Sequence, residues 1–450
     1  MKIAIIGGGI SGLTTAFYIK QGNPDIDITI FEKEEKLGGK MMTKQIDGFL
    51  FEEGSNGFLS NKPDTLELVK ESGCEDLLLR SSDKARVRFI YKDALHKLPE
   101  SPGAFLATPL LSFFGKLRVA GEILIPAKKD DSDETLESFG YRRVGKEMTN
   151  SFLDPMTAGI FASKPDKISV NAAFPAVVKL EKEYGGLFKG MMKKKKKEAG
   201  PGGVLMSFKG GVSAFVKSLA DFIDVNIKTG TPVKSIEKTE KKFLVHIQED
   251  KEEFDNVILS TPAYESAKIL NKVDSEFSVL LHDIEYSPIS VVGLGYSKLK
   301  HNLDGFGLLT TTSSKKEVLG VLWDSSIFED RADKGKKALR VMIGGQRNPD
   351  LALKSDEELK NIAIKGVKET MGIEELPDTV YVKKWEKGIP NYRVGHLERM
   401  QKLFEKLKKF DGLYLSSNAY FGVGLNDCVG NSKKVANEVI ASFKNRPQSK

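Results

Sequence analysis

The sequence predicts an α/β fold (α+β overall), in which a doubly wound domain carries an inserted helical lobe and a mixed-sheet domain. Three observations predict this fold. A strand, a glycine-rich loop and a helix open the chain, and a second buried strand follows at 26–32. The stretch 99–175 is mostly helical and interrupted by prolines, whereas strand-like runs dominate 225–344. A helix at 431–443 closes the chain, so we expect both chain ends to build the doubly wound domain.

The other elements follow from hydrophobic periodicity and from turn residues. Residues 2–6 read as a short buried strand with a glycine stop, and residues 10–20 read as a helix. Five consecutive lysines followed by Gly-Pro-Gly-Gly predict a solvated loop at 184–203. Further helices are expected at 65–72, 214–222 and 356–371, a hairpin at 86–91 and 94–98, and strands at 225–229, 242–248, 257–260, 290–296 and 338–344.

Composition excludes several classes of protein. The chain has 450 residues, of which 40% are hydrophobic and 29% charged, which excludes collagen, coiled coil and wholesale disorder. Its cysteines, Cys74 and Cys428, cannot form a disulfide framework or a cysteine-rich zinc site, and the five histidines lack ligand spacing. We therefore expect no metal and a reduced, cytoplasmic environment. The net charge of +7 comes without a basic face carrying interleaved aromatics, so no nucleic-acid partner is expected.

The sequence leaves the relation to membranes open. Strand residues begin at Lys2, so we expect no signal or transit peptide, and no uncharged apolar stretch is long enough to span a bilayer. The apolar stretch 103–127 is interrupted by Lys116, Arg118 and Glu122. Its phenylalanines and leucines predict either a peripheral patch on the cytoplasmic face of a membrane or a buried helical subdomain.

A dinucleotide signature stands at the start of the chain. Gly7, Gly9 and Gly12 form a GxGxxG loop, which also contains Ser11, between the first strand and the first helix. The glycines allow a tight turn, close backbone approach to a pyrophosphate and close helix packing, and the helix N-terminus favours the anion. Glu32 follows twenty residues after Gly12, at the end of the second strand, where its carboxylate can accept from ribose hydroxyls. The loop alone leaves NAD and FAD open.

The continuation resembles the FAD-dependent amine oxidase superfamily. The segments that carry the resemblance are Phe31-Glu32-Lys33, Leu37-Gly38-Gly39-Lys40, Phe51-Glu52-Glu53-Gly54 and Tyr420 to Cys428. The resemblance implies a non-covalent FAD. It implies cofactor-binding roles for Gly7, Gly9, Ser11, Gly12, Glu32, Gly39, Lys40, Gly54, Val233, Trp385, Gly422 and Val423.

Further segments are similar to the protoporphyrinogen and coproporphyrinogen oxidases within that superfamily. The segments are Arg88-Phe89-Ile90-Tyr91 with Leu95 to Pro99, Gly159-Ile160-Phe161-Ala162 with 167–174, Ser207 to Gly211, Trp385 with 390–396, and Gly422 to Cys428. They run through nearly the whole chain in the family's order. The departures from the family pattern are Ser163, Ser417, Asn418, Glu53 and Asn56.

This resemblance implies a porphyrinogen substrate, oxygen as the electron acceptor and a role in haem biosynthesis. The flavin carries the chemistry, so no catalytic side chain is expected. Arg88 is expected to bind a propionate, because a guanidinium fork matches a carboxylate, and Phe161 to contact the macrocycle. Leu309 and Trp323 are further possible contacts. The alternative for Phe161, Leu309 and Trp323 is plain core, and the alternative for Arg88 is a surface residue on an edge strand. Protoporphyrinogen and coproporphyrinogen both remain open, as does the oligomeric state.

Two other functions remain open. Another flavin oxidase or desaturase of the superfamily would act on amines or carotenoids, and an amine oxidase would use an aromatic cage with Tyr420 as one wall. A non-catalytic binding protein of this fold, similar to Rab-escort proteins, would lack a working dinucleotide loop.

The expected domain boundaries divide the chain into three parts. The doubly wound, Rossmann-like FAD-binding domain is expected to comprise residues 1–84, 203–263 and 380–450. The mixed-sheet substrate-binding domain would comprise 85–98 and 264–379. The helical lobe, in which any membrane contact is expected, would comprise 99–202.

Overall fold

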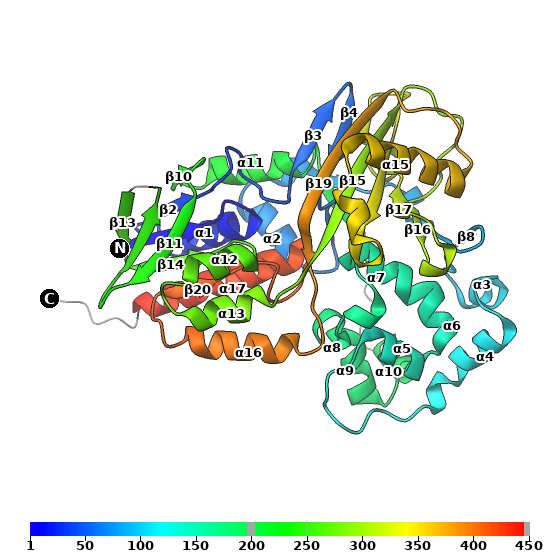
Figure 1. Cartoon of the computed structure of the whole chain (residues 1–450), viewed down its shortest axis with the longest axis horizontal. Helices are drawn as coiled ribbons and strands as arrows, with labels where there is room; N and C mark the ends of the chain where they lie inside the picture. Colours follow the sequence, from blue (N-terminus) through cyan, green and yellow to red (C-terminus); the bar gives the residue numbers. More distant parts are fainter. Residues whose placement is uncertain (196–202, 249, 445–450) are drawn as a thin grey trace.

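The structure is a computed structural model that describes residues 1–195, 203–248 and 250–444. Its doubly wound part lies on the left in Figure 1, the mixed sheet at the upper right and the helical lobe at the lower right. The predicted mixture of an α/β nucleotide-binding part with further sheet and helix is thus present.

A five-stranded parallel sheet is the centre of the doubly wound part. Its strands run in the order β10-β2-β1-β14-β20, and each pairs in parallel with its neighbours. The central strands are almost wholly buried runs of isoleucine, leucine and valine, as expected for a parallel sheet covered on both faces. The strands span Lys2–Ile6 (β1), Asp27–Phe31 (β2), Asn226–Lys228 (β10), Asn256–Leu259 (β14) and Leu413–Leu415 (β20).

Helices from both chain ends cover one face of this sheet. Helix α1 (Ile10–Gly22) packs against α17 (Leu425–Lys444), so the beginning and end of the chain lie together. Helices α2 (Asp64–Glu71) and α11 (Val212–Phe222) complete this layer and share its core. Helix α17 begins six residues before the expected start at 431.

The opposite face packs against a second layer. A three-stranded antiparallel sheet and three helices share one apolar core with the five-stranded sheet. The elements are β11 (Val233–Lys238), β12 (Phe243–Ile247), β13 (Asp250–Phe254), α12 (Ala263–Leu270), α13 (Ser275–His282) and α16 (His396–Leu407). Residues 263–282 therefore pack with the doubly wound part, which differs from the expected boundary at 263.

A seven-stranded mixed sheet forms the second large sheet, in the order β19-β15-β18-β17-β16-β7-β8. Helix α15 (Asp356–Met371) packs against one face, where the apolar residues form a separate core. The strands are β7 (Arg88–Tyr91), β8 (Leu95–Lys97), β15 (Tyr286–Tyr296), β16 (Gly307–Thr310), β17 (Val318–Leu322), β18 (Lys337–Gly344) and β19 (Thr379–Pro390). Because β19 pairs with β15, residues 380–390 belong to this sheet and not to the doubly wound part as expected.

Short elements connect these parts. They are β3 (Thr43–Ile46), β4 (Phe49–Glu52), β5 (Phe58–Leu59), β6 (Leu78–Arg80), β9 (Leu205–Phe208) and α14 (Asp324–Ile327). Strands β3 and β4 form a hairpin, and β9 lies between β5 and β6.

The helical lobe contains short helices. They are α3 (Pro102–Ala107), α4 (Phe113–Ala120), α5 (Leu136–Arg143), α6 (Lys146–Met148), α7 (Asp154–Phe161), α8 (Val170–Ala173), α9 (Pro175–Tyr184) and α10 (Leu187–Lys195). The loop expected at 184–203 was wrong over residues 187–195, which form α10; residues 196–202 lie outside the described residues. The buried Glu122 accepts hydrogen bonds from the first amides of α10, Leu187 N (2.8 Å) and Phe188 N (3.2 Å). This carboxylate stabilises the N-terminus of α10 from a distant part of the chain, so the sequence of α10 itself gives no indication of this contact.

A buried ion pair joins the lobe to the mixed sheet. Asp154, at the start of α7, lies 3.0 Å from the guanidinium of Arg347, which follows β18. The same carboxylate accepts hydrogen bonds from the amide and the hydroxyl of Thr312 at 2.7 and 2.8 Å. The side chains of both residues are buried, so this contact fixes the position of α7 over the sheet.

We predict an acid-dependent loss of stability that originates at His396. This buried imidazole lies against the Tyr392 ring, its Nε2 is 2.9 Å from the Tyr420 carbonyl, and burial lowers its pKa to about 4. The unfolded chain binds this proton near pH 6.5, so the folded state loses up to ~1.4 kcal/mol per pH unit between pH 6.5 and 4. His396→Gln, which keeps an N–H donor but does not titrate, should flatten the stability profile in that window, measured by urea unfolding.

The exposed His282 provides the matched control. His282→Gln should keep the wild-type slope. An unchanged slope in His396→Gln would show that the acid sensitivity originates elsewhere.

Candidate functional site

A large cavity of about 900 Å³ extends from the glycine loop after β1 to strand β7 of the mixed sheet. Its lining comes from the doubly wound part, the mixed sheet and the helical lobe. Gly9 lies at one end, Arg88 on β7 near the other, and Ile160 of α7 on the wall formed by the lobe. A cavity of this size is at the upper end of small-molecule sites.

The glycine loop has the geometry that a dinucleotide requires. Gly7 has a φ of +109°, and a Cβ there would lie 2.9 Å from the Ser260 carbonyl oxygen. A Cβ at Gly12 would overlap the Gly7 carbonyl, so α1 can approach the loop only without a side chain. At Gly9 the nearest atom to such a Cβ is 3.9 Å away, so this glycine faces open space in the cavity. Helix α1 begins at Ile10 without a side-chain cap, which leaves its first amides available for an anion.

Glu32 is held at the end of β2, beside this loop. Its carboxylate accepts hydrogen bonds from the amides of Gly8 (2.7 Å) and Glu34 (2.9 Å), and the side chain is buried. Glu32 does not line the cavity, but its contact with Gly8 puts it next to the phosphate loop, where an adenosine ribose is expected.

The second glycine segment lies against the first. The Gly38 amide donates to the Gly8 carbonyl at 2.9 Å, and Gly39 and Lys40 line the cavity. The Lys40 ammonium donates to the carbonyl of Lys387 at 2.8 Å and to that of Gly388, and burial lowers its pKa to about 8. The lysine thus holds the glycine segment against β19.

The loop after β4 is fixed by a network that the sequence analysis missed. Arg340 of β18 donates to the carbonyls of Glu52 (3.0 Å) and Gly54 (3.2 Å) and forms an ion pair with the buried Asp324 (3.1 Å). The Trp385 indole donates to the Glu53 carbonyl at 2.7 Å and lines the cavity. A charged residue within the otherwise apolar run 338–344, as Arg340 is, was the available signal.

Two polar side chains on the cavity wall have no partner within the described chain. Both amide atoms of Asn56 and the Ser260 hydroxyl are buried without a hydrogen bond. Buried polar groups almost always have partners, so these atoms are suited to bind a polar ligand or water in the cavity. Together with the glycine loop and the free helix N-terminus, these residues fit FAD.

The loop before α17 contains the remaining residues that the sequence analysis expects to bind the cofactor. Val423 lines the cavity, and Gly422, with a φ of +83°, makes the turn before it. Ser417 and Asn418, which depart from the family pattern, also line the cavity. Val233 lies outside the cavity lining, at the start of β11, where it pairs with Ile247.

Arg88 lies where a substrate carboxylate could reach it. Its side chain is exposed, lines the cavity and lies 5.0 Å above the Phe306 ring, and it makes no ion pair within the described ranges. Leu309 also lines the cavity.

Phe161, the expected macrocycle contact, lies outside the cavity lining. Residues Met156, Gly159 and Ile160 form the cavity face of α7, which turns Phe161 to the other side of the helix. There it packs edge-on against Tyr392, with ring centroids 5.9 Å apart. Trp323 and Tyr420 are likewise buried outside the cavity lining.

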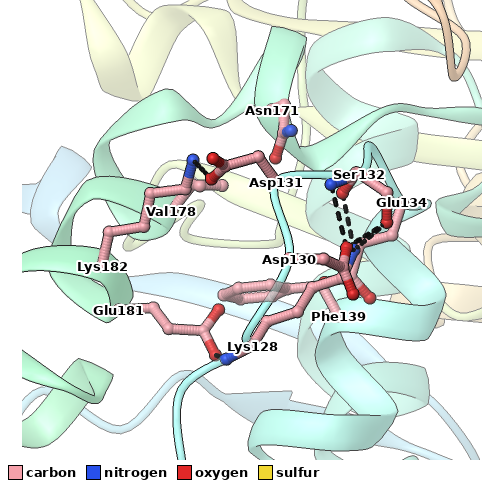
Figure 2. A pocket seen from close by; sticks show the side chains of 10 residues that line it. All are labelled: Lys128, Asp130, Asp131, Ser132, Glu134, Phe139, Asn171, Val178, Glu181 and Lys182. Atoms are coloured by element: carbon pink, nitrogen blue, oxygen red, sulfur yellow. Dashed lines mark hydrogen bonds and ion pairs between the residues drawn. The ribbon is translucent and has the colours of Figure 1, made fainter.

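A small polar hollow in the lobe is not a second site. It encloses about 20 Å³, room for one water, between α9 and the loop 128–134. Figure 2 shows its charged groups engaged with one another, among them Lys182 with Asp131 at 2.6 Å and Lys128 with Asp130 at 3.3 Å. Over the described residues, no cluster of side chains suits a metal ion, and no helix has the length and hydropathy to cross a membrane.

Comparison with known proteins gives consistent matches. Residues 10–440 match the family described as flavin containing amine oxidoreductase. Coproporphyrinogen III oxidase of Bacillus subtilis is 28% identical over 464 residues, covering 97% of each chain. Protoporphyrinogen oxidase, chloroplastic, of Oryza sativa subsp. japonica is 28% identical over 97% of this chain and 87% of its own.

Solved structures share the fold. One from Exiguobacterium sp. 255-15, provisionally described as a protoporphyrinogen oxidase, superposes with a TM-score of 0.87 and 25% identity, covering 98% of this chain and 99% of that one. A reduced UDP-galactopyranose mutase has a TM-score of 0.75 at 15% identity over 98% of this chain and 94% of that one, which shows the fold alone.

These matches confirm the resemblance to the protoporphyrinogen and coproporphyrinogen oxidases, the α/β FAD-binding fold and the FAD cofactor. The protein is a flavoprotein oxidoreductase, and the chain belongs to the flavin containing amine oxidoreductase family.

Proposed function

We propose that the protein oxidises a porphyrinogen, protoporphyrinogen or coproporphyrinogen, to the porphyrin in haem biosynthesis, with oxygen as the electron acceptor. The observation that carries this proposal is the continuous cavity, which joins the dinucleotide loop to Arg88 over an apolar sheet face. A flat, apolar macrocycle that carries propionates matches both features. The names of the relatives in Bacillus subtilis and Oryza sativa support the same reaction.

FAD would be held mainly by backbone and by buried polar groups. The loop from Gly7 to Gly12 and the N-terminus of α1 would take the pyrophosphate, and Glu32 the ribose. Asn56 offers an unpartnered donor and acceptor to a polar part of the cofactor. When bound, FAD supplies the hydride-accepting chemistry.

The protein's own residues bind and orient the substrate and exclude water. Arg88 would bind a propionate through its guanidinium fork, and its position above Phe306 keeps the charge at the cavity wall. Leu309, Val291 and Met342 would contact the macrocycle from the sheet. No side chain is assigned as a general base, because Glu53 is held by Lys383 at 2.9 Å and Lys40 by two carbonyls.

The amine oxidase alternative receives less support from the cavity. Tyr420, the expected wall of an aromatic cage, is 2% exposed and lies outside the cavity lining. A non-catalytic binding protein would not need the strictly glycine-dependent packing at Gly7 and Gly12. Turnover of amines in place of porphyrinogens would favour the first alternative, and a colourless protein the second.

We also propose a peripheral membrane contact through the tip of the helical lobe, at the right of Figure 1. Phe113, Phe114 and Leu117 of α4 are 69%, 79% and 53% exposed, and Leu124 just after it is 83% exposed. Single exposed apolar residues are ordinary, but this cluster of large ones on one segment is typical of an interaction surface.

Gly9→Val should yield a folded protein without FAD. The cavity has room for the added side chain, but that room is where backbone must approach the pyrophosphate. We expect FAD content, measured by absorbance after purification, to fall to about a tenth or less. Gly103→Val, at a position where a Cβ would contact nothing within 4 Å, is the control. Full FAD occupancy in Gly9→Val would show that the phosphate site is elsewhere.

Arg88→Ala should lower kcat/KM by roughly ten- to a hundred-fold, because hydrogen bonds to charged groups contribute about 1.5–3 kcal/mol. Arg88→Lys should recover part of the loss, since charge returns without the bidentate geometry. The measurement is fluorimetric oxidation of both porphyrinogens, with FAD content as a check on folding.

The neighbouring Arg86 gives the control for that series. It is exposed, lies 3.5 Å from Asp83 and does not line the cavity, so Arg86→Ala should behave as wild type. Wild-type kinetics in Arg88→Ala would remove its substrate role. Wild-type protein that carries FAD and oxidises neither porphyrinogen would refute the proposed function.

The membrane contact predicts that the protein sediments with vesicles of phosphatidylcholine and phosphatidylglycerol. Replacing Phe113 and Phe114 with serine should weaken this binding at least about tenfold, given ~1.5–3 kcal/mol for each buried phenylalanine. Val279→Ser, which changes a 63% exposed apolar residue on α13, should leave binding unchanged. Equal binding of all three proteins would exclude this segment as the contact.

A further inference from the structure

The charged groups that line the cavity are nearly all engaged. Among the described residues, the Lys, Arg, Asp and Glu side chains in the lining are Lys40, Glu53, Arg88 and Arg340. Three of them have partners: Lys40 donates to carbonyls of β19, Glu53 pairs with Lys383, and Arg340 pairs with Asp324. Of these four side chains, Arg88 is the one without such a partner, so it is available to bind a substrate carboxylate.

The wall beyond Arg88 is apolar. Strands β7 and β16 pair so that Gly307 lies opposite Arg88 and Leu309 opposite Ile90. Because alternate residues share a face, Arg88 and Ile90 point to the same side of the sheet, and Leu309 continues that surface away from the arginine. A Cβ at Gly159 would lie 2.9 Å from Leu309, so α7 packs directly on it.

Helix α7 contributes the rest of this apolar surface of the cavity. Its lining residues Pro155, Met156, Gly159 and Ile160 follow helical spacing and are all apolar. Ile160 is 43% exposed, so its side chain reaches the open space of the cavity. The wall formed by β16 and α7, called here the apolar wall, is defined by Met156, Gly159, Ile160 and Leu309.

A carboxylate placed against the apolar wall would lose water and gain no partner. Such desolvation without compensation is strongly unfavourable. A porphyrinogen with two propionates on neighbouring rings can direct both to the side of Arg88 and turn its vinyl groups to the wall. A porphyrinogen with four propionates, one on each ring, must direct at least one toward other parts of the cavity.

We propose that the apolar wall makes the enzyme selective for porphyrinogens whose acidic groups share one edge, such as protoporphyrinogen, over tetracarboxylates such as coproporphyrinogen. Ile160 is the specificity-determining residue of this wall. The proposal rests on the proposed function and refines it to one class of substrate.

The test compares kcat/KM for protoporphyrinogen and coproporphyrinogen in FAD-loaded wild type and in Ile160→Lys. Wild type should prefer protoporphyrinogen by about tenfold or more, as expected when a substrate group is left unpaired in a site. Ile160→Lys supplies a partly exposed cation that can pair with the extra carboxylate. It should reduce the ratio of the two kcat/KM values by about fivefold, mainly by lowering the KM for coproporphyrinogen. Leu376→Lys, at a residue that is 72% exposed and outside the cavity lining, should keep the wild-type ratio.

The outcomes separate this proposal from the proposed function. Equal turnover of both substrates, a preference for coproporphyrinogen, or an unchanged ratio in Ile160→Lys would overturn the role of the apolar wall while leaving porphyrinogen oxidation intact. Turnover of neither substrate would refute the proposed function. In that case, fluorescence titration with protoporphyrin IX and coproporphyrin III still tests the wall, and equal affinities would overturn it.

Discussion

One buried arginine connects the two halves of the cavity. Arg340 extends from the mixed sheet, and its guanidinium donates to two carbonyls of residues 52–54, at the end of the β3–β4 hairpin. Its charge is matched by Asp324, which is fully buried. A buried ion pair is costly to desolvate, so its net contribution depends on satisfying the remaining donors. Here the backbone carbonyls do so, and the geometry that satisfies Arg340 also fixes the loop 52–54 against the mixed sheet.

A buried ion pair also attaches the helical lobe to the mixed sheet. Asp154 is bound by Arg347 and by Thr312, so α7 cannot shift over the sheet without exposing a buried charge. The elements that bound the cavity are therefore joined by buried polar contacts, namely the ion pair of Asp154 with Arg347 and the bonds from Arg340 to the carbonyls of Glu52 and Gly54. This explains how a site assembled from distant parts of the chain keeps a defined shape.

The sequence predicted the structural features that depend on residues close together in the chain. The loop from Gly7 to Gly12, Glu32 and helix α15 follow from local spacing and periodicity, and the structure has them where expected. The prediction from sequence was wrong where a contact with a residue far away in the chain determines the local structure. Helix α10 begins on the carboxylate of Glu122, and β19 belongs to the mixed sheet because it pairs with β15. Phe161 was placed in the site by its motif, but its position on α7 turns it into the core.

The two ends of the cavity are lined by different kinds of atoms, so a ligand would order different amounts of flexible structure at each end. At the glycine loop the contacts come from backbone amides of rigid elements and from the buried amide of Asn56, groups that lose little freedom when a ligand binds. At the end with Arg88 they would come from apolar surface and from this one flexible, exposed side chain, which loses rotamer freedom when a ligand orders it. Under the proposed function, FAD would therefore meet the preorganised end of the cavity, and the substrate would meet the end where binding orders a long side chain.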